Sequence, residues 1–270
     1  MVVFTYLVTK DLVETLENKV GYKLSMESKS ELKKIEVEFL NKFWEFIPKD
    51  KRKCSLEASD VSRKIECYLE RRKREYTVVS LDRIYCKNAD EYLEVTRLTS
   101  PFSGKVCIAE RPGKEKLYHQ IKRLKNYSKI ILSDVGAFEG KTIINLCELF
   151  EKEKIDIAEV CLGIVREEAE IKIRARYNLK SVYKINFYEW VELRDLIGID
   201  GRNAGLRNGK RLIIPYWENS IKWASIPENK ESNFQELSKE FNSRVIWRLW
   251  QEGYDLSYIA TPIKYYGGKK

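Results

Sequence analysis

Residues 129–142, KIILSDVGAFEGKT, decide the fold of this 270-residue chain. The apolar start of this stretch predicts a strand that ends before Asp134, and a helix is predicted from about residue 141 to 154. The apolar residues at 155–165 predict the next strand. A strand, a helix and a second strand in this order are typical of a βαβ unit with parallel strands. The sequence therefore predicts an α/β protein with a parallel sheet.

The same alternation continues on both sides of this unit. Further strands are predicted at residues 77–81, 92–98, 106–109 and 181–187, and a further helix at 114–126. Apolar residues at spacings of three and four predict helices at 31–47, 61–76 and 232–252. The glycine-rich segment 198–211, GIDGRNAGLRNGKR, has no periodicity and predicts a long exposed loop.

These patterns divide the chain into three consecutive parts. Residues 1–75 form a helical N-terminal region, residues 76–190 an α/β core, and residues 191–270 a C-terminal α+β extension. We expect the phosphate- and ribose-binding residues in the core and a candidate hood in the C-terminal extension.

The segment between the strand and the helix has the properties of an anion-binding loop. Gly136 and Gly140 let backbone N–H groups approach a ligand closely, and a helix N-terminus carries about half a positive charge. Thr142 adds a hydroxyl donor, and Lys141 either neutralises a phosphate or packs outward. A P-loop is one interpretation, since Gly140-Lys141-Thr142 matches the end of Gly-x-x-x-x-Gly-Lys-Ser/Thr. Gly136 lies one residue too close for it, however, and the chain has no clear second strand that ends in aspartate.

The segment more closely resembles the ribose-phosphate loop of type I phosphoribosyltransferases, in which a strand leads into two acidic residues, a short loop and Gly-Gly-Thr. The resemblance covers about residues 76–166 and implies a phosphoribosyltransferase-like core in which Asp134 is the catalytic-site carboxylate that holds the ribose hydroxyls. It implies that the phosphate and ribose are bound by Gly136, Phe138, Glu139, Gly140, Lys141 and Thr142. Val135 stands where the family has its second acid, and Lys141 where it has a glycine, so binding is better supported than transfer.

A second turn precedes this loop by one helix, in residues 106–114, VCIAERPGK. In the family the corresponding loop binds pyrophosphate, and the resemblance implies this role for Arg111, Gly113 and Lys114. A plain strand-to-helix turn with proline and glycine is the alternative interpretation. Asp82, Arg83 and Arg97 also fall near strand ends. Surface ion pairs are their expected role, and a position facing the same cleft is the alternative.

In this family a variable hood region selects the nucleophile, usually a base, and residues 198–227 are the candidate here. Stacking faces for a base, and cations for a phosphate, would come from Tyr216, Trp217, Trp223, Arg202 and Arg207. Packing of these aromatic rings in a core is the competing interpretation.

The composition indicates an anionic partner, because 50 basic and 41 acidic residues give a net charge of +9. One histidine and no closely spaced cysteine pair predict no metal site held by the protein alone. No apolar run is long enough to span a membrane and no signal peptide is evident, so we expect a cytoplasmic protein. The Lys- and Glu-rich composition is similar to that of thermophile proteins. A homodimer is one oligomeric state that the sequence leaves open.

These observations predict a phosphoribosyltransferase-like protein that binds a phosphoribosyl compound or a nucleotide. In the catalytic version it is a pentosyltransferase that moves phosphoribose from phosphoribosyl pyrophosphate to a base-like nucleophile, with Mg²⁺ carried mainly by the substrate's pyrophosphate. One alternative is a non-catalytic nucleotide- or RNA-binding protein on the same fold, which Val135 and the basic residues at 202–211 favour. A degenerate P-loop kinase is the weaker alternative.

Overall fold

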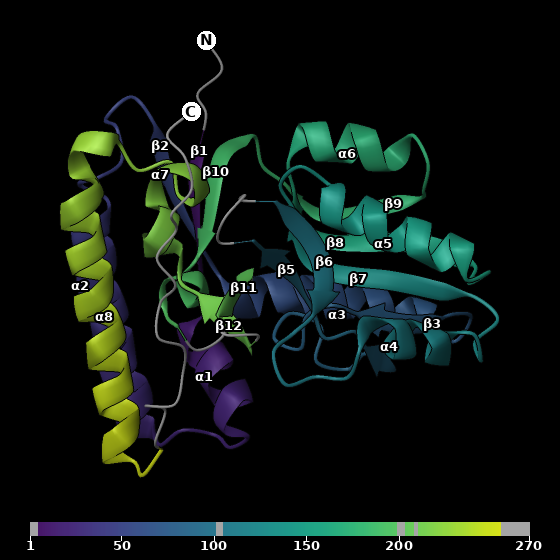
Figure 1. Cartoon of the computed structure of the whole chain (residues 1–270), viewed down its shortest axis with the longest axis horizontal. Helices are drawn as coiled ribbons and strands as arrows, with labels where there is room; N and C mark the ends of the chain where they lie inside the picture. Colours follow the sequence, from purple (N-terminus) through teal and green to yellow (C-terminus); the bar gives the residue numbers. More distant parts are fainter. Residues whose placement is uncertain (1–4, 101–104, 199–202, 208–209, 255–270) are drawn as a thin grey trace. The chain divides into compact units, whose positions relative to one another are not determined.

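The structure is a computed structural model that describes residues 5–100, 105–198, 203–207 and 210–254 (Figure 1). The chain forms two compact units: unit 1 comprises Met1–Leu56, Arg97–Cys107 and Tyr188–Lys270, and unit 2 comprises Glu57–Thr96 and Ile108–Phe187. This division differs from the three consecutive parts that we expected. The two ends of the chain share unit 1, and the segment 57–75 belongs with the α/β core.

Unit 2 is built on a five-stranded sheet with the order β4-β3-β7-β8-β9, in which each neighbouring pair is parallel. The predicted α/β core with a parallel sheet is therefore confirmed. Its elements are α3 (Ala58–Arg72), β3 (Thr77–Ser80), β4 (Glu91–Tyr92), α4 (Leu117–Leu124), β7 (Ile130–Ala137), α5 (Lys141–Lys152), β8 (Ile157–Val165), α6 (Glu167–Arg174) and β9 (Leu179–Lys184).

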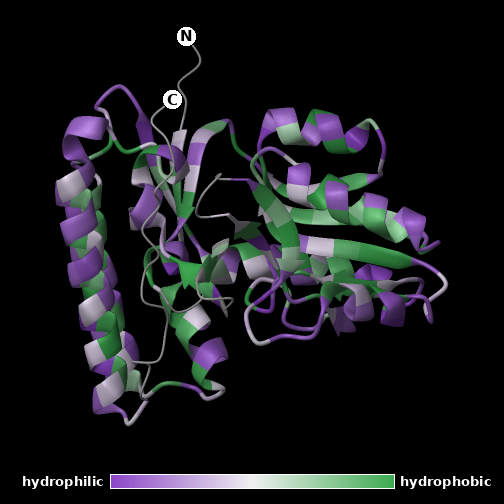
Figure 2. Ribbon diagram, viewed as in Figure 1, coloured by the Kyte–Doolittle hydropathy of each residue, from purple (hydrophilic) through white to green (hydrophobic). Residues whose placement is uncertain are grey.

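The central strands of unit 2 are apolar because helices cover both faces of the sheet. Figure 2 shows most of β7 and β8 in the colour of hydrophobic residues. On one face, residues of α4, α5 and α6 join those of the strands in a single apolar cluster that includes Ile121, Leu132 and Phe150. On the other face, α3 packs against β8 and β9 through Val61 and Ile65.

Gly163 sets how closely α3 approaches β8. A Cβ atom at this position would lie 2.5 Å from the carbonyl oxygen of Val135, 2.7 Å from Cγ1 of Val61 and 3.0 Å from Cδ1 of Ile65. The first of these neighbours is backbone in the adjacent strand, which moves only at the cost of the strand pairing. Glycine is therefore the residue that fits this contact.

Unit 1 contains a three-stranded sheet of order β10-β1-β2 and shares a four-stranded sheet of order β12-β11-β5-β6. The strands β5 (Val95–Thr99) and β6 (Val106–Glu110) run across the boundary between the units along the chain. The remaining elements are β1 (Thr5–Lys10), α1 (Leu12–Val20), α2 (Met26–Phe43), β2 (Arg52–Glu57), β10 (Phe187–Glu192), η1 (Leu193–Leu196), β11 (Asn203–Arg207), β12 (Lys210–Ile214), η2 (Tyr216–Asn219), α7 (Ser220–Trp223), η3 (Glu228–Lys230) and α8 (Glu231–Gln251).

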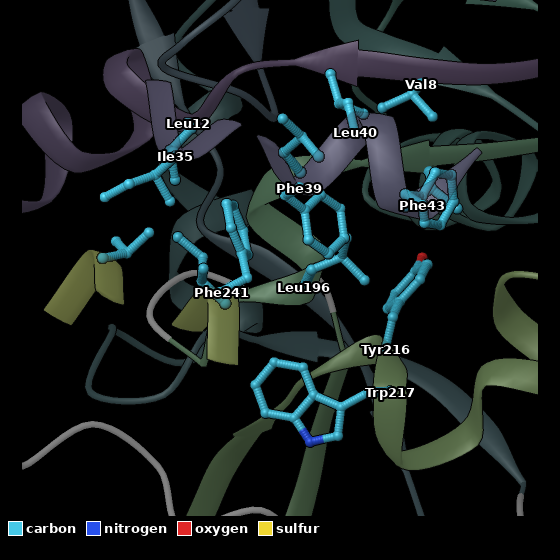
Figure 3. Packing of buried hydrophobic residues seen from close by; sticks show 14 of the residues in the cluster. Val8, Leu12, Ile35, Phe39, Leu40, Phe43, Leu196, Tyr216, Trp217 and Phe241 are labelled. Carbon is cyan, nitrogen blue, oxygen red and sulfur yellow. The ribbon is translucent and has the colours of Figure 1, made fainter. Parts of the chain in front are cut away.

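The core of unit 1 is aromatic and lies where α2 packs along α8 (Figure 3). The ring of Phe39 on α2 lies 4.4 Å from that of Phe241 on α8, measured between centroids, and Phe43 lies 5.7 Å from Phe234. The predicted helix 232–252 is confirmed as α8. The predicted helix 31–47 begins earlier, at Met26, because the hydroxyl of Ser25 accepts the amide N–H of Ser28 and caps it.

Four sequence predictions were wrong in position or type. The N-terminal region is only partly helical, because β1 and β2 lie within it, and the predicted strand 92–98 is split into β4 and β5. The predicted loop 198–211 contains β11 and β12, which pair antiparallel, while β11 pairs in parallel with β5. Pairing with a distant strand thus overrides the low strand propensity of its glycines. The strand β6 belongs to the four-stranded sheet, so the βαβ unit predicted just before β7 is not formed by β6.

Within the described part of the chain, none of the helices combines the length and the apolar character that a membrane crossing requires.

The contact at Gly163 predicts that Gly163→Ala lowers the stability of the protein. The added methyl group overpacks the interface between α3 and β8, which costs about 1–3 kcal/mol. We expect a drop of several degrees in the midpoint of thermal unfolding, at roughly 2–4 °C per kcal/mol for a chain of this size. Adding Val61→Ala removes the clashing Cγ1 methyl group of Val61. The loss of unfolding free energy in the double variant should therefore be smaller than the sum of the losses in the two single variants. A Gly163→Ala protein as stable as the wild type would refute this packing.

Candidate functional site

The strand order of unit 2 marks one place where a ligand fits. The chain goes from β3 outward to β4 on one side and from β7 through β8 to β9 on the other, so the order reverses between β3 and β7. In open α/β sheets, ligands bind outside the carboxyl ends of the strands at this reversal. The residues that follow β3, β4 and β7 are therefore the candidate site.

Strand β7 is longer than the sequence predicted. Its pairing with β8 continues through Asp134↔Leu162 and Gly136↔Ile164 to Ala137↔Val165, although β3 pairs with β7 only as far as Ser133. The prediction that the strand ends before Asp134 was wrong, because the apolar run of β8 extends the ladder. Asp134 and Gly136 are thus strand residues, and the loop itself consists of residues 138–140.

Asp134 is the first polar residue on its face of β7. The apolar side chains of Ile130 and Leu132 precede it on the face covered by α4, α5 and α6. Its carboxylate is partly exposed, and Oδ1 accepts the amide N–H of Val135 at 2.8 Å. The carboxylate of Asp134 therefore follows the last residue of β7 that pairs with β3, which is Ser133.

Helix α5 begins at Lys141, close to the predicted start, and Gly140 is its N-cap. The φ angle of Gly140 is +77°, which L side chains rarely adopt, and the glycine leaves no side chain to cap the first turn. The amide N–H groups of the first turn of a helix have no partner within it and attract anions. This terminus is the part of the predicted phosphate loop with the right local geometry.

The charged side chains beside this loop are paired. Lys141 Nζ lies 2.5 Å from Oε2 of Glu139, and the ammonium group lowers the pKa of Glu139 below its ordinary value. The guanidinium of Arg166, which follows β8, lies 4.9 Å from the ring centroid of Phe138 and 3.6 Å from Oε1 of Glu168. Lys141 is therefore directed toward Glu139, and Arg166 is the cation that packs over the loop.

Asp82 shapes the loop that follows β3. Its carboxylate is buried, and Oδ1 accepts the amide N–H of Ile84 at 2.8 Å and that of Tyr85 at 3.3 Å. The hydroxyl of Ser80 accepts the amide N–H of Asp82 at 3.1 Å and donates to its carbonyl oxygen at 2.9 Å. We expected a surface ion pair for Asp82; instead it organises a tight turn, for which the spacing Ser-x-Asp at the end of a strand was the available signal.

Three cations surround the carboxylate of Glu94, which follows β4. Arg83 Nε lies 2.7 Å from Oε1, Arg111 Nε lies 3.8 Å from Oε2, and Lys114 Nζ lies 3.8 Å from Oε1. We call Arg83, Glu94, Arg111 and Lys114 the Glu94 cluster. It contains two of the three residues predicted to bind pyrophosphate, together with Arg83, for which the sequence left a place in the same cleft open, and Glu94, which the sequence did not single out.

Backbone contacts fix the position of the Glu94 cluster. The amide N–H of Arg111 donates to the carbonyl oxygen of Glu94 at 2.7 Å, and that of Glu94 donates to Oε1 of Gln120 at 2.8 Å. Gly113, with φ +74°, lets the chain turn so that the amide N–H of Lys114 bonds the carbonyl of Arg111. The turn at 111–114 thus lies against the carboxyl end of β4, although β6 itself is outside the parallel sheet.

Glu94 is ionised at neutral pH. Burial by itself would raise the pKa of this carboxyl group, but the Arg83 hydrogen bond and the charges of Arg111 and Lys114 outweigh it. The pKa of Glu94 therefore lies below its ordinary value, and the cluster contains a permanent negative charge.

The predicted hood residues belong to unit 1. Tyr216 and Trp217 are buried in the core of unit 1 (Figure 3), where the Tyr216 hydroxyl accepts from Arg97 at 2.8 Å and its ring lies 5.4 Å from that of Trp223. Burial of these two rings does not fit the predicted role as stacking faces for a base. Arg202 and the side chain of Arg207 lie outside the described residues.

A polar cavity of about 480 Å³ lies at the opposite, amino edge of the sheet. It is lined by Tyr68, Arg72, Tyr76, Lys129, Ala158, Glu159, Arg174, Asn178 and Leu179. Its central polar groups contact one another: the Tyr68 hydroxyl lies 2.7 Å from both oxygens of Glu159, and Arg72 Nε lies 3.8 Å from Oε2. Its cations also pair with carboxylates outside the cavity lining: Arg72 with Glu75, Lys129 with Asp156 and Arg174 with Glu170.

A comparison with protein-family models and with curated protein sequences found no match to this chain. Among the described residues, no group of three or more His, Cys, Asp and Glu side chains is placed to hold a metal ion.

The turn after β3 predicts that Asp82→Ala is strongly destabilising. The substitution leaves the buried N–H group of Ile84 without its acceptor, which costs about 1–3 kcal/mol. Asp156→Ala is the matched control, because Asp156 is exposed and pairs with Lys129 at 3.5 Å, a surface contact worth about 0–1 kcal/mol. Denaturant unfolding measures both variants, and equal losses of stability would contradict the role of Asp82.

Proposed function

We propose that unit 2 binds a phosphorylated ribose compound at the carboxyl edge of its sheet, and that the ligand is phosphoribosyl pyrophosphate or a nucleotide. The observation that carries the proposal is the placement of two anion-attracting features at one edge. The glycine-capped terminus of α5 follows β7, and the Glu94 cluster follows β4, with β3 between these two strands. A ligand with a negative group at each end suits this arrangement.

The 5′-phosphate and ribose would bind beside β7. The N–H groups at the start of α5 would accept the phosphate, with Phe138, Glu139, Gly140, Lys141 and Thr142 around it. Asp134, which extends beyond the end of β3, would accept hydrogen bonds from the ribose hydroxyls. Both roles follow the resemblance to type I phosphoribosyltransferases and the local geometry of the strand and helix.

The pyrophosphate would bind at the Glu94 cluster. Arg83 and Lys114 are about half exposed, so their charges are accessible to a ligand. A guanidinium and an ammonium group that both lie against Glu94 suit the oxygens of a diphosphate. Mg²⁺ would neutralise part of the charge on this group and would be carried mainly by the pyrophosphate oxygens and water.

In the catalytic version of this proposal, a base-like nucleophile forms a bond to the anomeric carbon of the ribose. The bond from this carbon to the pyrophosphate oxygen breaks, and pyrophosphate leaves with the electron pair. The residues of the site would act by positioning the two ends of the substrate and by stabilising the charge of the leaving group.

A second candidate is a non-catalytic nucleotide- or RNA-binding protein on the same fold. The observation that favours it is the position of Val135, whose side chain is buried. The second acid of the family is thus replaced by a core residue. The P-loop alternative has less support, because only residues 138–140 connect β7 to α5 and cannot form a Gly-x-x-x-x-Gly cradle.

Thermal unfolding with added ligands tests the proposal. Phosphoribosyl pyrophosphate with Mg²⁺, at about 100 times its dissociation constant, stabilises the folded protein by about 2.7 kcal/mol. We expect the unfolding midpoint to rise by about 5 °C or more. Asp134→Asn should abolish this rise, because the amide keeps the shape of the side chain but loses the charge and two-fold acceptor capacity.

Asp156→Asn serves as the control for the loss of one exposed carboxylate, and its rise should equal that of the wild type. An unchanged midpoint with phosphoribosyl pyrophosphate would overturn the proposal. A rise of the unfolding midpoint with ATP or RNA, and not with phosphoribosyl pyrophosphate, would support the non-catalytic binding protein. For RNA, the affinity should also fall steeply as the salt concentration increases. Release of pyrophosphate in a screen of bases would establish transfer.

A further inference from the structure

The Glu94 cluster differs from the other ion pairs near the proposed site. Lys141 and Glu139 form a pair at the loop before α5, but at Glu94 one carboxylate is shared by Arg83, Arg111 and Lys114. Its side chain is 18% exposed, whereas those of Arg83 and Lys114 are 45% and 52% exposed. The carboxylate of Glu94 is thus less exposed to water than the two cations, Arg83 and Lys114, that pair with it.

The chain holds Glu94 and its arginine neighbours in fixed positions. Glu94 is tied by both backbone groups, through Gln120 and the amide of Arg111. The guanidinium of Arg83 lies 3.9 Å from the ring centroid of Tyr92, which orients its plane. Nε of Arg111 donates to the carbonyl oxygen of Val95 at 3.1 Å. The carboxylate and the guanidinium groups therefore form a prepared site and not a chance surface contact.

From this geometry we infer that Glu94 is an internal counter-ion, which holds the cations in place and competes with the pyrophosphate group of a ligand for them. The inference rests on the proposed function and concerns the part of the site that would bind pyrophosphate. A diphosphate that binds Arg83 and Lys114 competes with the hydrogen bond that Glu94 accepts from Arg83 and with its ion pair to Lys114, and it is repelled by the same carboxylate. Glu94 thus lowers the affinity for pyrophosphate and makes release of this group easier.

Titration calorimetry with inorganic pyrophosphate, without any ribose, tests the inference. Glu94→Gln removes the competing charge while it keeps the size of the side chain, so we expect it to bind pyrophosphate about tenfold or more tightly than the wild type. Glu148→Gln is the matched control, because it removes a carboxylate paired with Arg176 on the surface of the same unit and should leave the affinity unchanged. Lys114→Gln should weaken binding severalfold in both the wild type and Glu94→Gln.

The stability of the variants gives a second measurement. Without an anion, Glu94→Gln should unfold at a lower temperature than the wild type, since the three cations repel one another, and pyrophosphate should raise its midpoint more than that of the wild type. Equal or weaker binding of pyrophosphate by Glu94→Gln would overturn the inference and leave the proposed function standing. Absence of pyrophosphate binding in every variant would also overturn it.

Ribose 5-phosphate separates the two proposals, since it can occupy the site beside β7 without reaching the Glu94 cluster. A rise of the midpoint with ribose 5-phosphate that Asp134→Asn removes, together with no pyrophosphate effect, would retain the ribose-phosphate site and reject the role of Glu94. Tight pyrophosphate binding by Glu94→Gln, with no response of any variant to phosphoribosyl pyrophosphate or ribose 5-phosphate, would support Glu94 as a counter-ion and reject the proposed function.

Discussion

The pairing of β7 with β8 beyond the end of β3 is the constraint on which the rest of the site depends. The pairing continues to Ala137, whereas β3 pairs with β7 only as far as Ser133, so Asp134 lies on a part of β7 that pairs with β8 alone. For the same reason only three residues separate the end of β7 from the start of α5. The close approach of α3 at Gly163 holds the same two strands from the other face. A rigid pair of strands thus presents both the carboxylate and the helix terminus, which is the arrangement that binding sites require.

The elements that the sequence predicted well are those specified by local patterns. The helices α5 and α8 and the strand β8 have clear periodicity or long apolar runs, and their bounds lie close to the predicted ones. The hairpin of β11 and β12 had no such pattern, because its strands are stabilised by contacts such as Asn203↔Arg97 between residues far apart in the chain. Local propensity carries no information on a partner about a hundred residues away.

The candidate site shows the same limit. Gly140 and Lys141 were found from the glycine, lysine and threonine at a helix start, and Arg111 and Lys114 from a basic turn after a strand. Glu94 gave no signal, because one glutamate in a partly apolar segment is typical of any edge strand. Its importance comes from the turn at 111–114, which folds back against it. For Tyr216 and Trp217 the sequence suggested a binding role, but the structure buries both rings in a core. Aromatic side chains suit either role, so their identity alone does not distinguish the two.

The way the chain passes between the two units has a consequence for its synthesis. Unit 2 is complete once residue 187 has been made, but unit 1 needs α8, the last described helix, to cover the aromatic face of α2. A chain growing on the ribosome can therefore form the parallel sheet while Phe39 and Phe43 still lack their partners on α8. Such exposed apolar surface is what leads to aggregation, and contacts between distant segments form slowly. The face of α2 that packs on α8 is therefore uncovered during the whole synthesis of unit 2.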